Sequence, residues 1–124
     1  EIKFLDIKPK SYIIRMERVR YADDIPVVFE VTAIPEKIIK SFKKEAITKH
    51  FFKTLTDHGF VIGKSQQTIS ASNANEMTAD YLAISRGHAV LTLAQVSYFE
   101  NGMPFEYVRS QYVGERFEFY LENK

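Results

Sequence analysis

The stretch AVLTLAQVSYFENGMPFEYVRSQYV, residues 89–113, carries the clearest indication of the fold class. Runs rich in Val, Leu, Tyr and Phe lie on both sides of Asn101-Gly102. Asn-Gly is the strongest short hairpin signal, because both central positions of the favoured turn need a positive φ. We therefore expect antiparallel strands over 89–99 and 104–113, joined by a two-residue loop. That register predicts three facing pairs: Ser97 with Glu106, Gln95 with Val108, and Leu91 with Tyr112.

The predicted register gives this hairpin one unusually polar face, which Gln95, Ser97, Glu106 and Tyr112 would share. Such a face could line a cavity for a polar ligand. It could equally be the solvent side of an antiparallel sheet. The hairpin alone leaves both interpretations open.

A second hairpin is predicted in RVRYADDIPVVFE, residues 18–30. We expect strands over 11–21 and 26–34. A three-residue loop over 23–25 would place Arg18 opposite Glu30, with Arg20 opposite Val28 on the same face, whereas a two- or four-residue loop would separate Arg18 from Glu30. Two guanidinium groups beside a carboxylate can hold an anion and read hydroxyls or an amine. The alternative is a solvated ion pair, worth about 0–1 kcal/mol.

The remaining elements make this an α+β domain, an antiparallel β-sheet with two or three helices. We expect helices over 36–43, from Thr48 to Gly59, and from Asn73 to Leu82, where Asn73 and Glu76 form a capping-box-like pair. Strands are expected over 61–70 and, in the aromatic tail, over 117–120.

The helix predicted to start at Thr48 breaks a local rule. Thr48 is the predicted N-cap, which places Lys49 and His50 in the first turn, where the helix dipole disfavours cations. An anion such as phosphate would resolve this through free backbone N–H groups, the Thr48 hydroxyl and His50. Alternatively, both side chains point into solvent at little cost.

Composition excludes several classes of function. Lys and Arg number 17 against 16 Asp and Glu, so the chain lacks the basic excess typical of nucleic-acid binding. It has no cysteine, no apolar run long enough to span a bilayer, and no metal-ligand spacing among its three histidines. No phosphate-binding or dinucleotide-binding Gly-rich loop is present, so we expect no cofactor. The chain begins at Glu1 rather than Met, which suggests a fragment whose other domains are missing.

Three stretches together resemble a known family. They are the run R-x-R-x-A-D-x-x-P-x-x-x-E at 18–30, ISASNANEMTADYLAISRG at 69–87, and YFENGMPFEYVRSQYVGERFEF at 98–119. In order and spacing they are similar to the UbiC transcription regulator-associated (UTRA) domain. That domain is the effector-binding half of HutC-type regulators in the GntR superfamily.

The resemblance implies a chorismate-lyase-like fold that binds a small effector and signals to a winged helix-turn-helix domain, expected before Glu1. It also implies a homodimer, and effectors such as phosphosugars, amino-sugar phosphates or urocanate. In phosphosugar-binding members, the residues that contact the ligand are the two arginines of R-x-R, the start of the helix after the second strand, the glutamate of P-x-x-x-E and the later glutamate of P-x-E-Y. In this sequence those ligand-binding positions are Arg18, Arg20, Glu30, Thr48, His50, Phe51, Glu106 and Tyr112.

We therefore expect a cytoplasmic, small-molecule-sensing domain of a bacterial transcriptional repressor, with operator DNA bound by the missing domain and no membrane partner. The effector would be a phosphorylated, sugar-derived metabolite. Two alternatives stay open. One is a chorismate-lyase-type enzyme in which Arg20 holds a substrate carboxylate. The other is a dimerisation module without a ligand, with the aromatic strands and tail as its interface.

Overall fold

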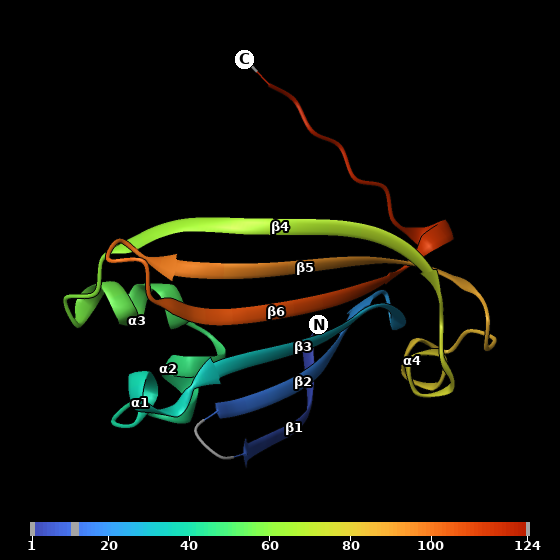
Figure 1. Cartoon of the computed structure of the whole chain (residues 1–124). Helices are drawn as coiled ribbons and strands as arrows, with labels where there is room; N and C mark the ends of the chain where they lie inside the picture. The colour runs from blue at the N-terminus through green and yellow to red at the C-terminus, as the bar shows by residue number, and fades with distance from the viewer. Residues whose placement is uncertain (1, 11–12, 124) are drawn as a thin grey trace.

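The computed structural model describes residues 2–10 and 13–123, and its centre is one antiparallel sheet of six strands (Figure 1). The spatial order is β1-β2-β3-β6-β5-β4. The strands are β1 (Ile2–Lys10), β2 (Ile13–Ala22), β3 (Ile25–Pro35), β4 (Ile62–Asn73), β5 (Ala89–Phe99) and β6 (Pro104–Val113). The helices are α1 (Glu36–Ile39), α2 (Lys44–Thr48), α3 (Phe51–Asp57) and α4 (Glu76–Leu82), followed by the 3-10 turn η1 (Gly114–Arg116). The predicted α+β class is confirmed.

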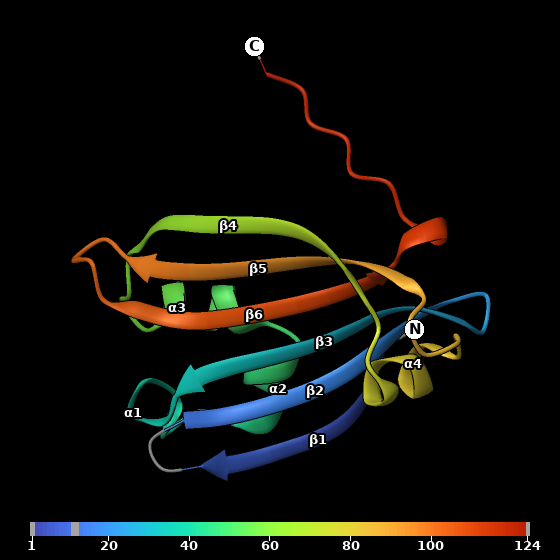
Figure 2. The same cartoon turned by 45° about the vertical axis from the view of Figure 1, so that its right-hand side comes forward.

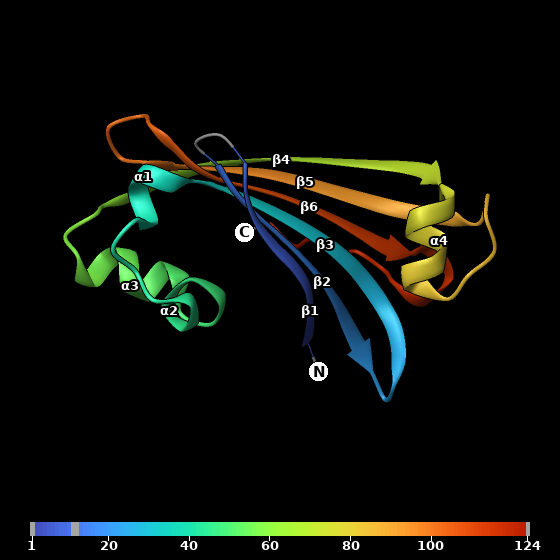
Figure 3. The same cartoon turned by 90° about the horizontal axis from the view of Figure 1, so that it is seen from below.

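The helices pack against opposite ends of the sheet, α1–α3 at one end and α4 at the other (Figure 3). They also cover opposite faces. Met16 belongs to the apolar cluster under α1 and α3, and Val19 belongs to the cluster under α4. These residues lie three positions apart on one regular stretch of strand, so their side chains point to opposite sides. Both faces of β3 are consequently buried: Phe29 is 1% exposed and Ile34 is 0% exposed.

The turn between β2 and β3 differs from the prediction, although the predicted pairs are present. Asp23 and Asp24 form a two-residue turn, and both have positive φ. The turn thus pairs Ala22 with Ile25, and a register shift between Arg20 and Tyr21 leaves Val27 as an extra residue on β3. Beyond this bulge the pairs are as predicted: Arg20 with Val28, and Arg18 with Glu30.

The turn between β5 and β6 also differs in length from the prediction, and an extra residue again restores the predicted register. Among the described residues, Gly102 has a positive φ and Asn101 does not. The Phe99 amide donates to the Met103 carbonyl, and the Gly102 amide to the Phe99 carbonyl, so the loop has three residues instead of the predicted two. Phe105 is the extra residue that corrects the register. The three predicted pairs are confirmed: Ser97 with Glu106, Gln95 with Val108, and Leu91 with Tyr112.

The predicted N-cap at Thr48 is wrong, because Thr48 ends α2 and the following helix, α3, begins at Phe51. Thr48 is the last residue of α2, and its hydroxyl donates to the Lys44 carbonyl at 3.0 Å. That bond points the side chain back along α2, so it cannot cap a following helix. Lys49 and His50 form the link to α3, and His50 occupies the N-cap position without a side-chain hydrogen bond.

Three further expectations need correction. The N-cap of α4 is Asn75, which accepts from the Thr78 amide at 2.8 Å, whereas Asn73 is the last residue of β4. The structure contains β1, which the sequence did not predict, and it assigns no strand to residues 117–120. The predicted start of β2 at residues 11 and 12 lies outside the described residues.

Candidate functional site

An open cavity of about 510 Å³ lies between the sheet and the α2–α3 segment. Its floor comes from β2, β3 and β6, and its wall comes from the end of α2, the link and the first turn of α3. It is lined by Met16, Arg18, Glu30, Thr32, Ile47, Thr48, Lys49, His50, Phe51, Phe52, Lys53, Glu106 and Val108. Its size is that of a small-molecule site.

The floor is built on the pair that the β2–β3 register creates. Arg18 donates from Nε to Glu30 Oε1, and its guanidinium forms an ion pair with the same carboxylate. Ser110, opposite Glu30 on β6, donates from Oγ to Glu30 Oε2 at 3.3 Å. The side chains of Arg18 and Glu30 are 24% and 13% exposed, so the pair is largely withdrawn from water. This desolvation makes the pair more than a solvated surface contact.

Glu106 is the second carboxylate of the floor. The pKa of Glu106 is raised to about 7, chiefly by burial and also by the Glu30 carboxylate, while the Arg18 guanidinium acts against both. One arginine thus serves two nearby carboxyl groups. Glu106 can therefore change protonation state near neutral pH, and it can donate as well as accept a hydrogen bond.

The wall opposite this floor is cationic. Lys49, His50 and Lys53 line the cavity, and all three are exposed, although Lys53 Nζ also pairs with Asp57 Oδ2 at 2.9 Å. The first hydrogen bond of α3 runs from the Thr54 amide to the His50 carbonyl, so helix geometry leaves the preceding amides without intrahelical acceptors. The cavity therefore has a positive, donor-rich wall and a carboxyl-rich floor. This arrangement suits a ligand with an anionic end and a hydroxyl- or amine-bearing end.

Six of the eight residues predicted from the sequence line this one cavity: Arg18, Glu30, Thr48, His50, Phe51 and Glu106. Arg20 and Tyr112 do not line it. They belong to the next row of the sheet, where Val28 lies opposite both, and Tyr112 stacks on Phe117 with ring centroids 3.9 Å apart. Their predicted contacts with a ligand stay predictions.

Sequence reasoning missed Phe52 and Lys53 as lining residues. Phe52 is 43% exposed, and its ring packs edge-on to that of Phe105 at 5.6 Å. Both residues directly follow Phe51, so a cavity beside the start of α3 includes them. The sequence pattern did not indicate them because it placed the N-cap at Thr48, two residues before the observed N-cap at His50.

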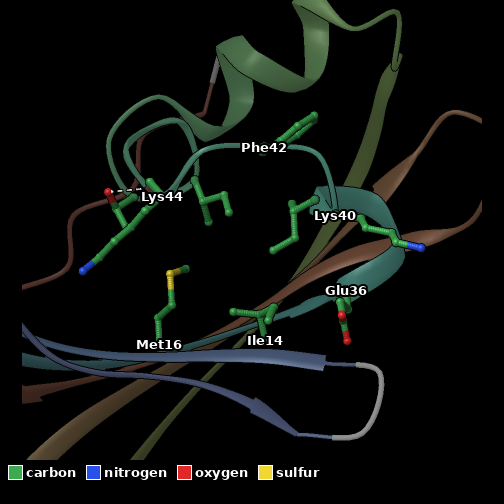
Figure 4. Close-up of a pocket in the computed structure, with 9 residues that line it drawn as sticks. Ile14, Met16, Glu36, Lys40, Phe42 and Lys44 are labelled. Atoms are coloured by element: carbon green, nitrogen blue, oxygen red, sulfur yellow. Dashed lines mark hydrogen bonds between the residues drawn. The ribbon is translucent and has the colours of Figure 1, made fainter.

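A second cavity, of about 360 Å³, adjoins the first (Figure 4). Met16, Ile47 and Thr48 line both cavities. The remaining lining residues are Ile14, Glu36, Ile39, Lys40, Phe42 and Lys44. Figure 4 shows Ile14 and Met16 rising from β2 toward Phe42 on the segment between α1 and α2. This space is mostly apolar, and its charged lining residues are Glu36, Lys40 and Lys44.

Across residues 2–10 and 13–123, no group of three His, Cys, Asp or Glu side chains could hold a metal ion. No helix in those ranges has the length and apolar character needed to cross a membrane.

The sequence family of the chain follows from comparison with known proteins. The family model of the UTRA domain matches residues 1–118. The chain belongs to the UTRA domain family. The UTRA chain is 32% identical over 114 residues to the HTH-type transcriptional repressor NagR of Bacillus subtilis, covering 88% of this chain and 45% of NagR. It is 25% identical to the HTH-type regulator YydK of the same organism, covering 95% of this chain and 50% of YydK.

The structural comparison agrees with this assignment. A crystal structure of a GntR-family transcriptional regulator from Enterococcus faecalis superposes with a TM-score of 0.92 at 50% identity, covering 99% of this chain and all of that one. These relatives are transcriptional regulators, and the family predicted from the sequence is confirmed. The UTRA chain spans about half the length of the curated relatives that it matches.

Proposed function

We propose that this UTRA domain is the effector-sensing part of a HutC-type, GntR-family transcriptional repressor, and that its effector is a phosphorylated, sugar-derived metabolite. One observation carries the proposal. A single cavity faces the cationic segment Lys49–Lys53 toward a floor that contains Glu30 and Glu106. The similarity to the repressor NagR supports the regulatory role.

Each end of the effector has a matching group in the cavity. The phosphate would lie along residues 48–53, where Lys49 and Lys53 supply positive charge and the His50 ring supplies a hydrogen-bond donor. The sugar hydroxyls or an amine would meet Glu30 and Glu106. Arg18 holds Glu30 in place through a hydrogen bond and an ion pair. Arg20 and Tyr112, one row further along the sheet, would contact a longer effector.

Regulation would follow from coupling between two sites in a longer, cytoplasmic protein. We propose that this protein is a homodimer whose winged helix-turn-helix domains bind operator DNA. The effector would bind one arrangement of the dimer better than another and so shift a pre-existing equilibrium. By linkage, operator DNA must then weaken effector binding by the same factor by which the effector weakens DNA binding.

Calorimetric titration of the chain with a panel of sugar phosphates and the matching unphosphorylated sugars tests the proposed ligand class. We expect at least one sugar phosphate to bind, and its parent sugar to bind at least tenfold more weakly. The double variant Lys49→Ala/Lys53→Ala should weaken binding about a hundredfold or more, because each of the two lost charged hydrogen bonds contributes ~1.5–3 kcal/mol. The control Lys37→Ala/Lys64→Ala removes two exposed lysines outside the cavity and should leave binding unchanged. Equal affinity for phosphorylated and parent sugars would refute the proposal.

One observation favours the enzyme alternative enough to test it. The near-neutral pKa of Glu106, beside Arg18, is what a general acid needs. Pyruvate release from chorismate is the corresponding assay. We expect no turnover, since the relatives are transcriptional regulators. Multiple turnovers by the natural chain that are lost in Glu106→Gln would show that the domain is an enzyme and would refute the sensor function.

A further inference from the structure

The C-terminal segment, residues 117–122, has the pattern of a strand without forming one in this chain. Phe117, Phe119 and Leu121 alternate with Glu118, Tyr120 and Glu122. Such alternation is typical of a strand with one buried face. The backbone is extended at Phe117, yet the structure assigns no strand to residues 117–123. Within the described part of the chain, no strand therefore pairs with this segment.

The apolar side of this segment lies in solvent. Phe119 is 44% exposed and Leu121 is 71% exposed, with Tyr120 at 78% on the other side. Within residues 2–10 and 13–123, the contacts that anchor the segment lie at its root, where Phe117 stacks on Tyr112 and Arg116 donates to the Pro26 carbonyl at 3.0 Å. Figures 1 and 2 show the segment passing β4 and leaving the body of the domain. Large apolar side chains on a projecting arm mark an interaction surface.

Strand β4 offers the matching partner. It ends the sheet order, and it is twelve residues long with every residue after Ile62 exposed. Its sequence, IGKSQQTISASN, contains one charged residue and no proline. Edge strands are usually protected by charge, proline or short length, because their free N–H and C=O groups recruit other strands. Beyond the irregularity near Gly63, β4 lacks this protection over most of its length.

We propose that residues 117–122 add as a strand to the exposed edge of β4 in a second copy of this chain. The arm projects beyond its own β4, so the arm and the edge of one molecule are both available to a second molecule (Figures 1 and 2). Two-fold symmetry makes the contact reciprocal, with each copy giving an arm and receiving one. The charges of the two segments are also complementary, because the arm carries Glu118 and Glu122 whereas the charged residue of β4 is Lys64.

This inference rests on the homodimer of the proposed function and names its surface. It is separate from the ligand class, which calorimetry tests independently. The addition of a strand supplies backbone hydrogen bonds to both edges, and the apolar side of the arm gains cover from the partner.

Light scattering after gel filtration of the chain is the first test. We expect a dimer, and we expect Phe119→Glu/Leu121→Glu to be monomeric at concentrations where the natural chain is dimeric. The matched control, Glu118→Gln/Glu122→Gln, changes the other side of the arm and should remain dimeric. A dimeric Phe119→Glu/Leu121→Glu variant would overturn the inference and leave the homodimer intact. A monomeric natural chain would overturn the homodimer and the inference together, without bearing on ligand binding.

Cross-linking tests the pairing of arm and edge. The chain has no cysteine, so introduced cysteines are the only thiols. Leu121→Cys mixed with Thr68→Cys, or with its neighbour Gln67→Cys, should form a disulfide-linked heterodimer on mild oxidation. Leu121→Cys mixed with Lys37→Cys, which places the thiol on α1, should not. Equal yields from the β4 and α1 partners would contradict strand addition, whatever the oligomeric state.

Discussion

Arg18 on β2 lies directly opposite Glu30 on β3, although the turn joining these strands has the length that should place them on opposite faces. The extra residue Val27 corrects the register between the turn and the pair. The bulge therefore brings the guanidinium and the carboxylate to the same side of the sheet. That side is the floor of the larger cavity.

Removal of the arginine should destabilise the domain. Arg18→Ala leaves the Glu30 and Glu106 carboxyl groups without their shared counter-charge in a partly desolvated site. We expect the free energy of unfolding to fall by about 1–3 kcal/mol. Arg15→Ala, which removes a more exposed ion pair with Glu17, is the control and should cost at most ~0.5 kcal/mol. Urea unfolding of both variants at pH 7.5 measures the difference, and similar losses would contradict a special role for Arg18.

Glu106 should make stability depend on pH. Its pKa is about 7 in the folded domain against an ordinary value of 4.5, so the native state holds more protons between these values. The free energy of unfolding should therefore decrease as pH rises from about 4.5 through 7. The group would cost up to ~3 kcal/mol above that window. Glu106→Gln removes the titration, so the variant should match the natural chain near pH 4.5 and exceed it at pH 8. Parallel stability curves for the two proteins would rule out the raised pKa.

The tip of the β2–β3 hairpin can be stabilised. Asp24 has a φ of 65°, a conformation that costs a side chain more than it costs glycine. Asp24→Gly keeps the two-residue turn in its preferred Asp-Gly form and should raise stability by about 0.5–1 kcal/mol. The reverse exchange, Gly59→Ala at a φ of 87°, should lower it. Thermal unfolding compares the two, and a loss of stability in Asp24→Gly would contradict the turn geometry.

Two asparagines, Asn73 and Asn75, lie before α4, and only the structure shows that Asn75 is the N-cap. Asn75 accepts the Thr78 amide, so Asn75→Ala should cost about 1 kcal/mol. Asn73→Ala, at the exposed end of β4, should cost much less. Thermal unfolding of the two variants decides between them, and a larger loss for Asn73→Ala would support the cap expected from the sequence.

The sequence predicted strand pairing better than turn geometry. Both hairpin registers are correct at Arg18–Glu30 and Ser97–Glu106, yet both loop lengths differ by one residue. In each hairpin a bulge compensates for the difference. A strand register appears in the sequence as a two-residue periodicity over many positions, whereas the single extra residue of a bulge produces no comparable pattern in the sequence.

The helical region shows a similar limit. The run ITKHFFKTL predicts a helix with Thr48 as its N-cap, whereas Thr48 ends α2 and His50 occupies the N-cap position of α3. The unpredicted strand β1 is an edge strand that contains Pro9, a residue that weakens strand assignment everywhere except at an edge. Only the assembled sheet provides the partner that makes it a strand.

The composition of the cavity was partly predictable. The family pattern indicated six lining residues, but the near-neutral pKa of Glu106 arises from burial and from a carboxylate 76 positions away in the sequence. Phe52 and Lys53 join the lining only because α3 begins at Phe51. Such properties depend on how distant segments pack.

A crystal structure of the chain with a bound hexosamine phosphate tests whether the cavity over Glu30 and Glu106 is the effector site. We predict a tetrahedral group within hydrogen-bonding distance of residues 48–53, with the sugar lying against Glu30 and Glu106. Density for the ligand in the apolar cavity beside Ile14 and Phe42, with the larger cavity free of it, would contradict the account.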